Sequence, residues 1–229
     1  MKYPILLPSQ KELRHGRRYL AFETVFLGYF LRLFVSLFNL GWDSARLNLT
    51  FFCLNFAVTV VLFRFFLKKS ACAAVKRVPI ILATVVVGFF VCYGLTTLVG
   101  MAIVAFEPAF FNVNNKNLSS ISQQHYWLTT VCTIFLVPVT EELLHRGAVF
   151  GGLRRTSRVL AYGVSTAVFA MVHISTYIGH YEPRILLLCY LQYIPAGLCL
   201  AASYDLTGSI VTPILIHAVI NAVGTLAMR

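Results

Sequence analysis

The chain has 229 residues, of which 59% are hydrophobic and only 12% are charged, with a formal net charge of +11. Soluble domains are about 45–50% apolar and about 25% charged, so this composition excludes an ordinary soluble globular domain. The positive charge does not indicate a nucleic-acid-binding protein, because most lysines and arginines flank apolar runs, where membrane proteins meet anionic lipid head groups. We therefore expect membrane lipid as a partner and no nucleic acid.

The first residues are polar and basic. No short apolar core with a small-residue cleavage site follows them, so we interpret residues 1–18 as a cytoplasmic basic N-terminal segment and not as a cleavable signal peptide. Apolar runs follow, most of about 20 residues, the length a helix needs to cross a hydrocarbon core of about 30 Å. They cover about residues 20–41, 47–67, 79–106, 125–153, 157–178, 185–204 and 208–228.

These runs predict an all-α fold, a polytopic transmembrane helix bundle of about seven spans. Glu23 and Arg32 lie inside the first run, which leaves open that this segment lies along the membrane interface and that six helices cross. The only long polar connection covers about residues 107–124 and is rich in Asn and Ser. The six cysteines form no C-x-x-C pair, so we expect neither a disulfide framework nor a thiolate metal site.

The basic residues predict the orientation of the bundle. With the spans as above, twelve counted lysines and arginines lie on the side of the N-terminus and four on the other side. The twelve are Lys2, Lys11, Arg14, Arg17, Arg18, Lys68, Lys69, Lys76, Arg77, Arg154, Arg155 and Arg158, and the four are Arg46, Lys116, Arg184 and Arg229. By the positive-inside rule the N-terminus is cytoplasmic. We expect a multi-pass integral protein of a bacterial plasma membrane.

Several polar and ionisable side chains fall at membrane depth in the C-terminal half. Such groups cost several kcal/mol unless they are paired or face a cavity, so they mark a candidate functional site. They are Glu141, Glu142, His145, Arg146, His173, His217 and Asn221.

Helical spacing groups these residues. Side chains four apart share a helix face, so Glu142 lies over Arg146, and the two charges can neutralise each other. Glu141 is then the acid that faces inward. His145, four residues later, lies on the same helix face as Glu141. The alternative for this segment is a helix end whose charges reach the cytoplasmic head groups.

The two other candidate positions lie on later spans. His173 stands four residues after Phe169, and alone it is as easily a hydrogen-bonded core histidine as a functional group. His217 and Asn221 share a face, and the amide is well placed to hold the imidazole in one orientation.

These groups suit hydrolysis of an amide bond. A carboxylate can take a proton from water, and an imidazole or amide N–H can stabilise the oxyanion that forms. The same groups can instead hold a divalent metal such as zinc through Glu141, His173 and His217, with an open position for water, as in a metalloprotease. The pattern is not the H-E-x-x-H helix of zinc proteases. The sequence leaves both versions open, with no cofactor or with a metal.

Three short motifs follow one another along the chain. They are E-E-x-x-x-R at residues 141–146, F-x-x-x-H at 169–173 and H-x-x-x-N at 217–221, the last preceded by a Thr-Gly-Ser turn at 207–209. Their order and spacing resemble the CAAX-protease and bacteriocin-processing family of intramembrane proteases, which includes the prenyl-protein endopeptidase of the endoplasmic reticulum. One departure is His145, where family members usually carry an aromatic or aliphatic residue.

The resemblance implies a membrane-embedded hydrolase. It divides the chain into accessory transmembrane helices over residues 19–124 and a four-helix catalytic core over 125–229, around a cavity open to the cytoplasm or the membrane. The implied activity is intramembrane proteolysis by an endopeptidase that acts on a membrane-associated protein or peptide.

The resemblance also assigns roles to the motif residues. Glu141 would activate water with help from His173, and His217 and Asn221 would form the oxyanion site. Glu142 and Arg146 would be supporting residues.

Two other classes of function remain open. The family includes members suspected of acting as bacteriocin-immunity or scaffold proteins, so a non-catalytic role is one alternative. Ionisable groups inside a membrane also mark ion pathways, so a small transporter is another. A transporter would be expected to show inverted repeats or paired half-helices, and the sequence displays neither.

Overall fold

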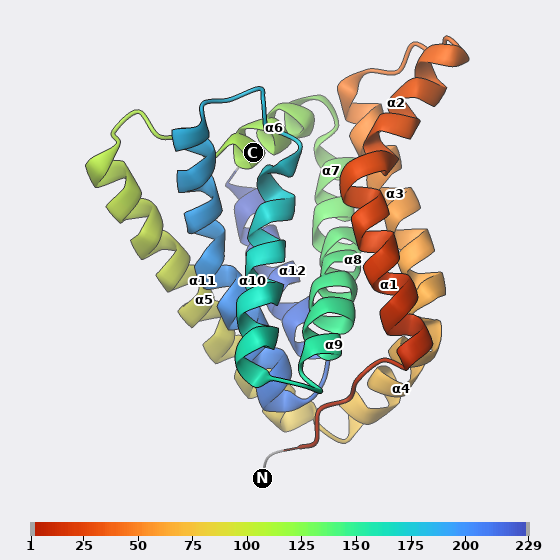
Figure 1. Cartoon of the computed structure of the whole chain (residues 1–229). Coiled ribbons are helices and arrows are strands. Elements are labelled where there is room, and N and C mark those ends of the chain that lie inside the picture. The colour runs from red at the N-terminus through yellow and green to blue at the C-terminus, as the bar shows by residue number, and fades with distance from the viewer. Residues whose placement is uncertain (1–2, 228–229) are drawn as a thin grey trace.

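The computed structural model describes residues 3–227, and all regular structure in that part of the chain is helical (Figure 1). Lys2 and Arg229, which enter the basic count above, lie outside the described residues. In chain order the elements are α1 (Gln10–Phe22), η1 (Glu23–Leu27), α2 (Gly28–Leu37), α3 (Ser44–Leu62), α4 (Arg64–Val75), α5 (Val78–Phe106), α6 (Val113–Gln124), α7 (Tyr126–Val131), η2 (Cys132–Leu136), α8 (Val137–Glu142), η3 (Leu143–Phe150), α9 (Gly151–Leu153), α10 (Arg158–Ser175), α11 (Pro183–Thr207) and α12 (Val211–Leu226).

These elements build seven membrane helices. α1, η1 and α2 form one continuous helix, Gln10–Leu37, and α7 to α9 form another, Tyr126–Leu153. With α3, α5, α10 and α11 they make six helices that are long and apolar enough to cross a membrane, and the shorter apolar α12 completes the bundle. The prediction of an all-α, multi-pass membrane protein with about seven spans is confirmed. The described part of the chain starts at one end of the bundle and finishes at the other, as an odd number of crossings requires (Figure 1).

The outside of the bundle is apolar. In an apolar stretch of 18 residues within α5, only 11% of the residues are buried inside the protein. Large hydrophobic side chains such as Phe90 and Met101 are exposed along this helix. Backbone groups inside each helix bond one another, so such a surface can face lipid without leaving polar groups unpaired. Polar side chains gather in the interior instead, which is where the candidate site lies.

From residue 3 onward, the N-terminal segment has a defined path along the bundle. Residues 3–9 run across one end of the bundle, where the Leu6 amide donates to the Gly208 carbonyl at 3.1 Å and the Tyr204 hydroxyl donates to the Leu6 carbonyl. The first helix begins at Gln10 and not near residue 20, because Ser9 caps it in a reciprocal pair with Glu12. The segment therefore ties the Thr-Gly-Ser turn of the third motif to the first helix.

Two short helices lie outside the membrane core. α4 lies at the end of the bundle where the chain begins, and α6 lies at the opposite end, within the connection predicted only to be polar (Figure 1). Asn112 accepts the Asn115 amide at 3.0 Å and so caps α6. The polar connection is therefore a folded cover over the bundle.

Glycines allow two close helix contacts around the site helix. A Cβ atom on Gly16 of α1 would lie 2.4 Å from the Phe63 ring and 3.0 Å from Ala148 of η3. A Cβ atom on Gly197 of α11 would lie 2.7 Å from a Thr166 methyl group of α10. α1 thus packs directly on η3, and α10 packs directly on α11.

Candidate active site

The helix that carries the first motif is irregular on both sides of the motif. π-helical turns cover Cys132–Leu136 and Leu143–Phe150, and every residue of the second stretch is buried. π-turns rotate the following side chains relative to a regular helix and occur frequently at functional sites. Here they flank α8, which ends with Glu141 and Glu142.

Glu142 and Arg146 form the predicted ion pair. Arg146 Nη1 lies 3.0 Å from Glu142 Oε1, and both side chains are 0% exposed. Arg146 Nη2 also donates to the Gly197 carbonyl at 3.0 Å, and its guanidinium carbon lies 4.4 Å from the centre of the Phe169 ring. The arginine therefore contacts a charge, a carbonyl and an aromatic face, while its buried Nε has no hydrogen-bond partner in the described chain.

Glu142 also holds the imidazole of His217. His217 Nδ1 lies 2.9 Å from Glu142 Oε1, and a carboxylate partner is best met by an N–H, so Nδ1 carries the proton and Nε2 presents a lone pair in the neutral ring. The Asn221 amide, which was expected to orient the His217 ring, does not hydrogen-bond to it. Asn221 Nδ2 donates to the Thr133 carbonyl at 2.8 Å. That expectation was wrong because the ring turns toward the stronger acceptor on another helix.

His173 is oriented in the same way by its own helix. Its Nδ1 lies 2.8 Å from the Phe169 carbonyl, which can only accept, so Nδ1 is again the protonated nitrogen. Nε2 faces Glu141 Oε2 at 3.7 Å, and Nε2 of His217 lies 4.0 Å from the same oxygen. Two imidazoles from two helices therefore face one carboxylate oxygen with the same nitrogen.

Glu141 is the least constrained acid of the group. Its side chain is 22% exposed, whereas that of Glu142 is 0% exposed. Its buried Oε2 has no hydrogen-bond partner in the described chain, and the two imidazole distances are too long for direct hydrogen bonds. Polar atoms at such separations are commonly bridged by water.

His145, the departure from the family pattern, does not bind the Glu141 carboxylate. Its Nδ1 lies 2.7 Å from the Glu141 main-chain carbonyl, and the ring is buried. It packs edge-on against Phe169 with ring centres 5.3 Å apart. Phe169 also contacts His173 and His217, with centre distances of 4.6 and 6.1 Å. The aromatic residue of the second motif thus packs against all three histidines.

Two neighbours of this cluster were not predicted. Tyr193 of α11 stacks on His173 with ring centres 4.1 Å apart, and a tyrosine within an apolar run gave no signal of this. Glu23 of the first span accepts a hydrogen bond from Asn55 Nδ2 of α3 at 2.9 Å, and its charge interacts with that of Glu141. The acid that argued against a first span is therefore buried and paired within the bundle.

The side chains of Glu141, His173 and His217 are of the types that bind a metal ion, but the distances between their ligand atoms are too long for a metal site. Two imidazole nitrogens with free lone pairs and one carboxylate oxygen are usual zinc ligands. Ligands bound at about 2.0–2.2 Å lie about 3.3 Å from one another in a tetrahedral site, closer than the 3.7 and 4.0 Å found here. Within residues 3–227, no group of three His, Cys, Asp or Glu side chains is arranged to hold a metal.

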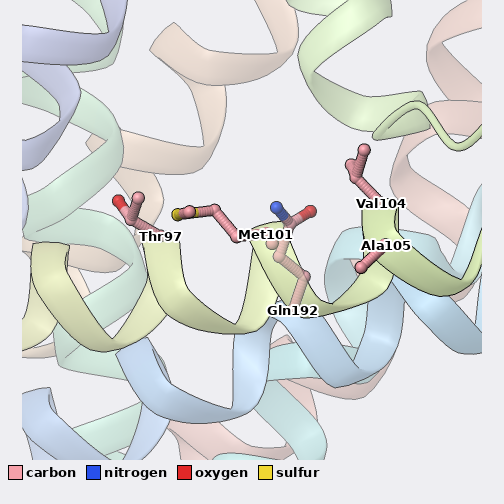
Figure 2. Close-up of a pocket in the computed structure, with 6 residues that line it drawn as sticks. Thr97, Met101, Val104, Ala105 and Gln192 are labelled. Carbon is pink, nitrogen blue, oxygen red and sulfur yellow. The ribbon is translucent and has the colours of Figure 1, made fainter. Parts of the chain in front are cut away.

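The motif residues line neither of two pockets on the bundle. A pocket of about 580 Å³ lies beside α5 and α11, and Figure 2 shows side chains that line it. They are Thr97, Gly100, Met101, Val104, Ala105 and Gln192. A second pocket of about 240 Å³ lies between α4, α5 and α12. The cavity implied by the family resemblance is thus not represented by either pocket.

Comparison with known proteins supports the resemblance. No curated protein and no solved structure shows a significant match to the chain. Residues 123–223 match the family model of the type II CAAX prenyl endopeptidase Rce1-like proteins, and this segment contains all three motifs and the whole histidine–glutamate cluster. Over residues 123–223, which contain the three motifs, the chain is therefore similar to the type II CAAX prenyl endopeptidase Rce1-like family.

Proposed function

We propose that the protein is an intramembrane endopeptidase in which Glu141 activates a water molecule to hydrolyse a peptide bond. One observation carries the proposal. Glu141 Oε2 is free of hydrogen bonds within the described chain and faces Nε2 of His173 and of His217 at 3.7 and 4.0 Å. A carboxylate held next to two imidazoles, at a spacing that water can bridge, is a suitable general base.

The reaction balances with these groups alone. Glu141 takes one proton from water while the water oxygen forms a bond to the carbonyl carbon of the substrate. The carbonyl oxygen becomes an oxyanion. The C–N bond then breaks, and the Glu141 proton passes to the nitrogen, which leaves as an amine. The products are a carboxyl group and an amine, and no acyl-enzyme forms.

His217 and Asn221 can stabilise the oxyanion. The Nδ1–H of His217 is fixed on Glu142, so a second proton on the ring must lie on Nε2, which then donates toward the reacting carbonyl. Asn221 uses one amide hydrogen on the Thr133 carbonyl and retains a second.

We propose that the basic end of the bundle is cytoplasmic. The N-terminal segment, α4 and the turn between α9 and α10 lie at this end, and they carry most of the counted lysines and arginines (Figure 1). We expect the membrane to be the plasma membrane of a bacterium. The substrate is then a membrane-associated protein or peptide, such as a peptide pheromone or a leader peptide, or a prenylated protein where prenylation occurs.

The experiment compares cells that carry the wild-type protein with cells that carry Glu141→Gln. Glutamine keeps the size and polarity of the side chain but cannot accept the proton. Profiling of peptide termini in membranes should show cleavage products that disappear in the variant, since general base catalysis contributes roughly 10²–10⁴-fold. Glu182→Gln, an exposed residue in the loop before α11, is the matched control and should leave the products unchanged.

Two results would contradict the proposal. If Glu141→Gln membranes contain the same cleavage products as the wild type, the chain is not a glutamate-dependent protease. If a phenotype of the deleted gene is fully restored by Glu141→Gln, the non-catalytic scaffold or immunity role is favoured instead.

A further inference from the structure

The imidazole of His173 packs against two aromatic rings. Phe169 lies one turn earlier on α10, with ring centres 4.6 Å apart and planes at 56°. Tyr193 of α11 lies closer, at 4.1 Å and 30°. Because, within residues 3–227, the imidazole hydrogen-bonds only to the Phe169 carbonyl, these rings limit its rotation.

The hydroxyl of Tyr193 hydrogen-bonds to two asparagines at the start of α6, the N-cap Asn112 and Asn114 in its first turn. It donates to Asn112 Oδ1 at 3.2 Å and accepts from Asn114 Nδ2 at 3.3 Å. Asn114 Oδ1 in turn accepts from the Tyr177 hydroxyl at 3.3 Å. Tyr193 therefore has its ring on His173 and its hydroxyl on a network of side chains outside the three motifs.

Asn112 connects this network to two other places. Its Oδ1 also accepts the Asn115 amide at 3.0 Å, which caps α6, and its Nδ2 donates to Gln192 Oε1 at 2.8 Å. The Gln192 amide lies among the residues that line the larger pocket (Figure 2). Asn112 thus connects α6, a residue that lines the larger pocket, and the tyrosine that stacks on His173.

We propose that Tyr193 is a positioning residue for His173, and that Asn112 and Asn114 set its position. The proposal rests on the proposed function, in which Nε2 of His173 assists Glu141. That nitrogen lies 3.7 Å from Glu141 Oε2, so a small ring rotation changes whether one water can bridge the two atoms. A misplacement of about 1 Å in a catalytic group can cost about 10²-fold in rate.

Three variants distinguish the contribution of the Tyr193 ring from that of its hydroxyl. Tyr193→Leu removes both and should lower the rate by roughly 10–100-fold, with little change in KM. Tyr193→Phe keeps the ring on His173 and should cost less. Asn112→Ser keeps a good cap for α6 but is too short to reach the tyrosine hydroxyl, so it should match Tyr193→Phe. The double variant with Phe and Ser should cost less than the sum of the two single changes, because both remove the hydrogen bond between Tyr193 and Asn112.

The first measurement follows the imidazole directly. The full chain, labelled with ¹⁵N-histidine and purified in detergent, should show His173 in one tautomer, with its signal assigned by His173→Gln. Tyr193→Leu should shift or broaden that signal. Tyr190→Phe, which removes a hydroxyl from the same helix, is the control and should not. A His173 signal that is unchanged in Tyr193→Leu would overturn the proposal.

The second measurement follows activity. The probe is the membrane fraction of cells that carry Glu141→Gln, which retains uncleaved substrate, incubated with purified wild type or variant. New peptide termini are counted over time at several membrane concentrations, and melting temperatures are recorded alongside. Wild-type rates and KM in Tyr193→Leu would overturn the positioning role. A shifted His173 signal with no cleavage by the wild type would instead refute the proposed function and leave the positioning of His173 intact.

Discussion

Replacing Arg146 by methionine should destabilise the protein more than replacing Glu141 by glutamine. Methionine keeps much of the volume of the arginine stem but removes its charge and its donors. In the native protein the guanidinium donates to Glu142 at 3.0 Å and to the Gly197 carbonyl at 3.0 Å. After the substitution, Glu142 is a buried carboxylate with His217 as its remaining partner, and the Gly197 carbonyl loses its side-chain donor.

The expected cost follows from these lost partners. Removing one member of a buried ion pair costs about 3–5 kcal/mol, because it leaves the other charge uncompensated. The Arg146 and Glu142 side chains are both 0% exposed, so water cannot replace the partner without opening the bundle. For a chain of this size each kcal/mol corresponds to about 2–4 °C in Tm, which gives a fall of about 6–20 °C.

Thermal unfolding in detergent, followed by the fluorescence of Trp42 and Trp127, measures this. Glu141→Gln is the matched comparison and should melt within about 2 °C of the wild type, because the Oε2 atom it replaces has no hydrogen bond in the described chain. Adding Glu142→Gln to Arg146→Met removes the stranded charge and should recover part of the loss. Equal shifts for Arg146→Met and Glu141→Gln would refute the structural role of the ion pair.

Three further predictions test the orientation, the helix packing and the chemistry. In a cysteine-free background, an impermeant thiol reagent applied outside the cell should label Lys116→Cys but not Lys69→Cys, and the reverse pattern would invert the bundle. Gly197→Ala should destabilise the protein by about 1–3 kcal/mol, measured as a lower Tm, because its Cβ would lie 2.7 Å from a Thr166 methyl group. Proteolytic activity should survive a zinc chelator, and a loss that added zinc restores would favour the metal-dependent version.

The architecture could be predicted because its signals are local. Each apolar run specifies a membrane helix by length and composition alone, and seven runs correspond to seven helices. The Glu142–Arg146 ion pair could also be predicted from the sequence, since both residues lie on one helix at a spacing of four. The start of the first helix was misplaced because Ser9 and Glu12 cap a polar turn that carries no apolar signal.

The contacts between helices could not be read from spacing. His217 and Glu142 are 75 positions apart, and their hydrogen bond depends on how α12 and α8 are rotated against each other. Spacing placed Asn221 on the same face as His217 but could not show that a π-turn leaves the Thr133 carbonyl for the amide to bind. The contact of Tyr193 with His173 could not be predicted for the same reason, since it depends on the packing of α10 against α11.

The geometry gives two adjacent glutamates different surroundings. Consecutive residues on a helix point about 100° apart, so Glu141 and Glu142 face different neighbours. Arginine does not lose its proton in proteins, and Glu142 Oε1 lies 3.0 Å from the Arg146 guanidinium, so Glu142 is committed to an ion pair. The partners that face Glu141 are imidazoles, whose protons can move. The acid beside a permanent cation is thus suited to hold His217, and the acid beside titratable rings is suited to exchange a proton with water.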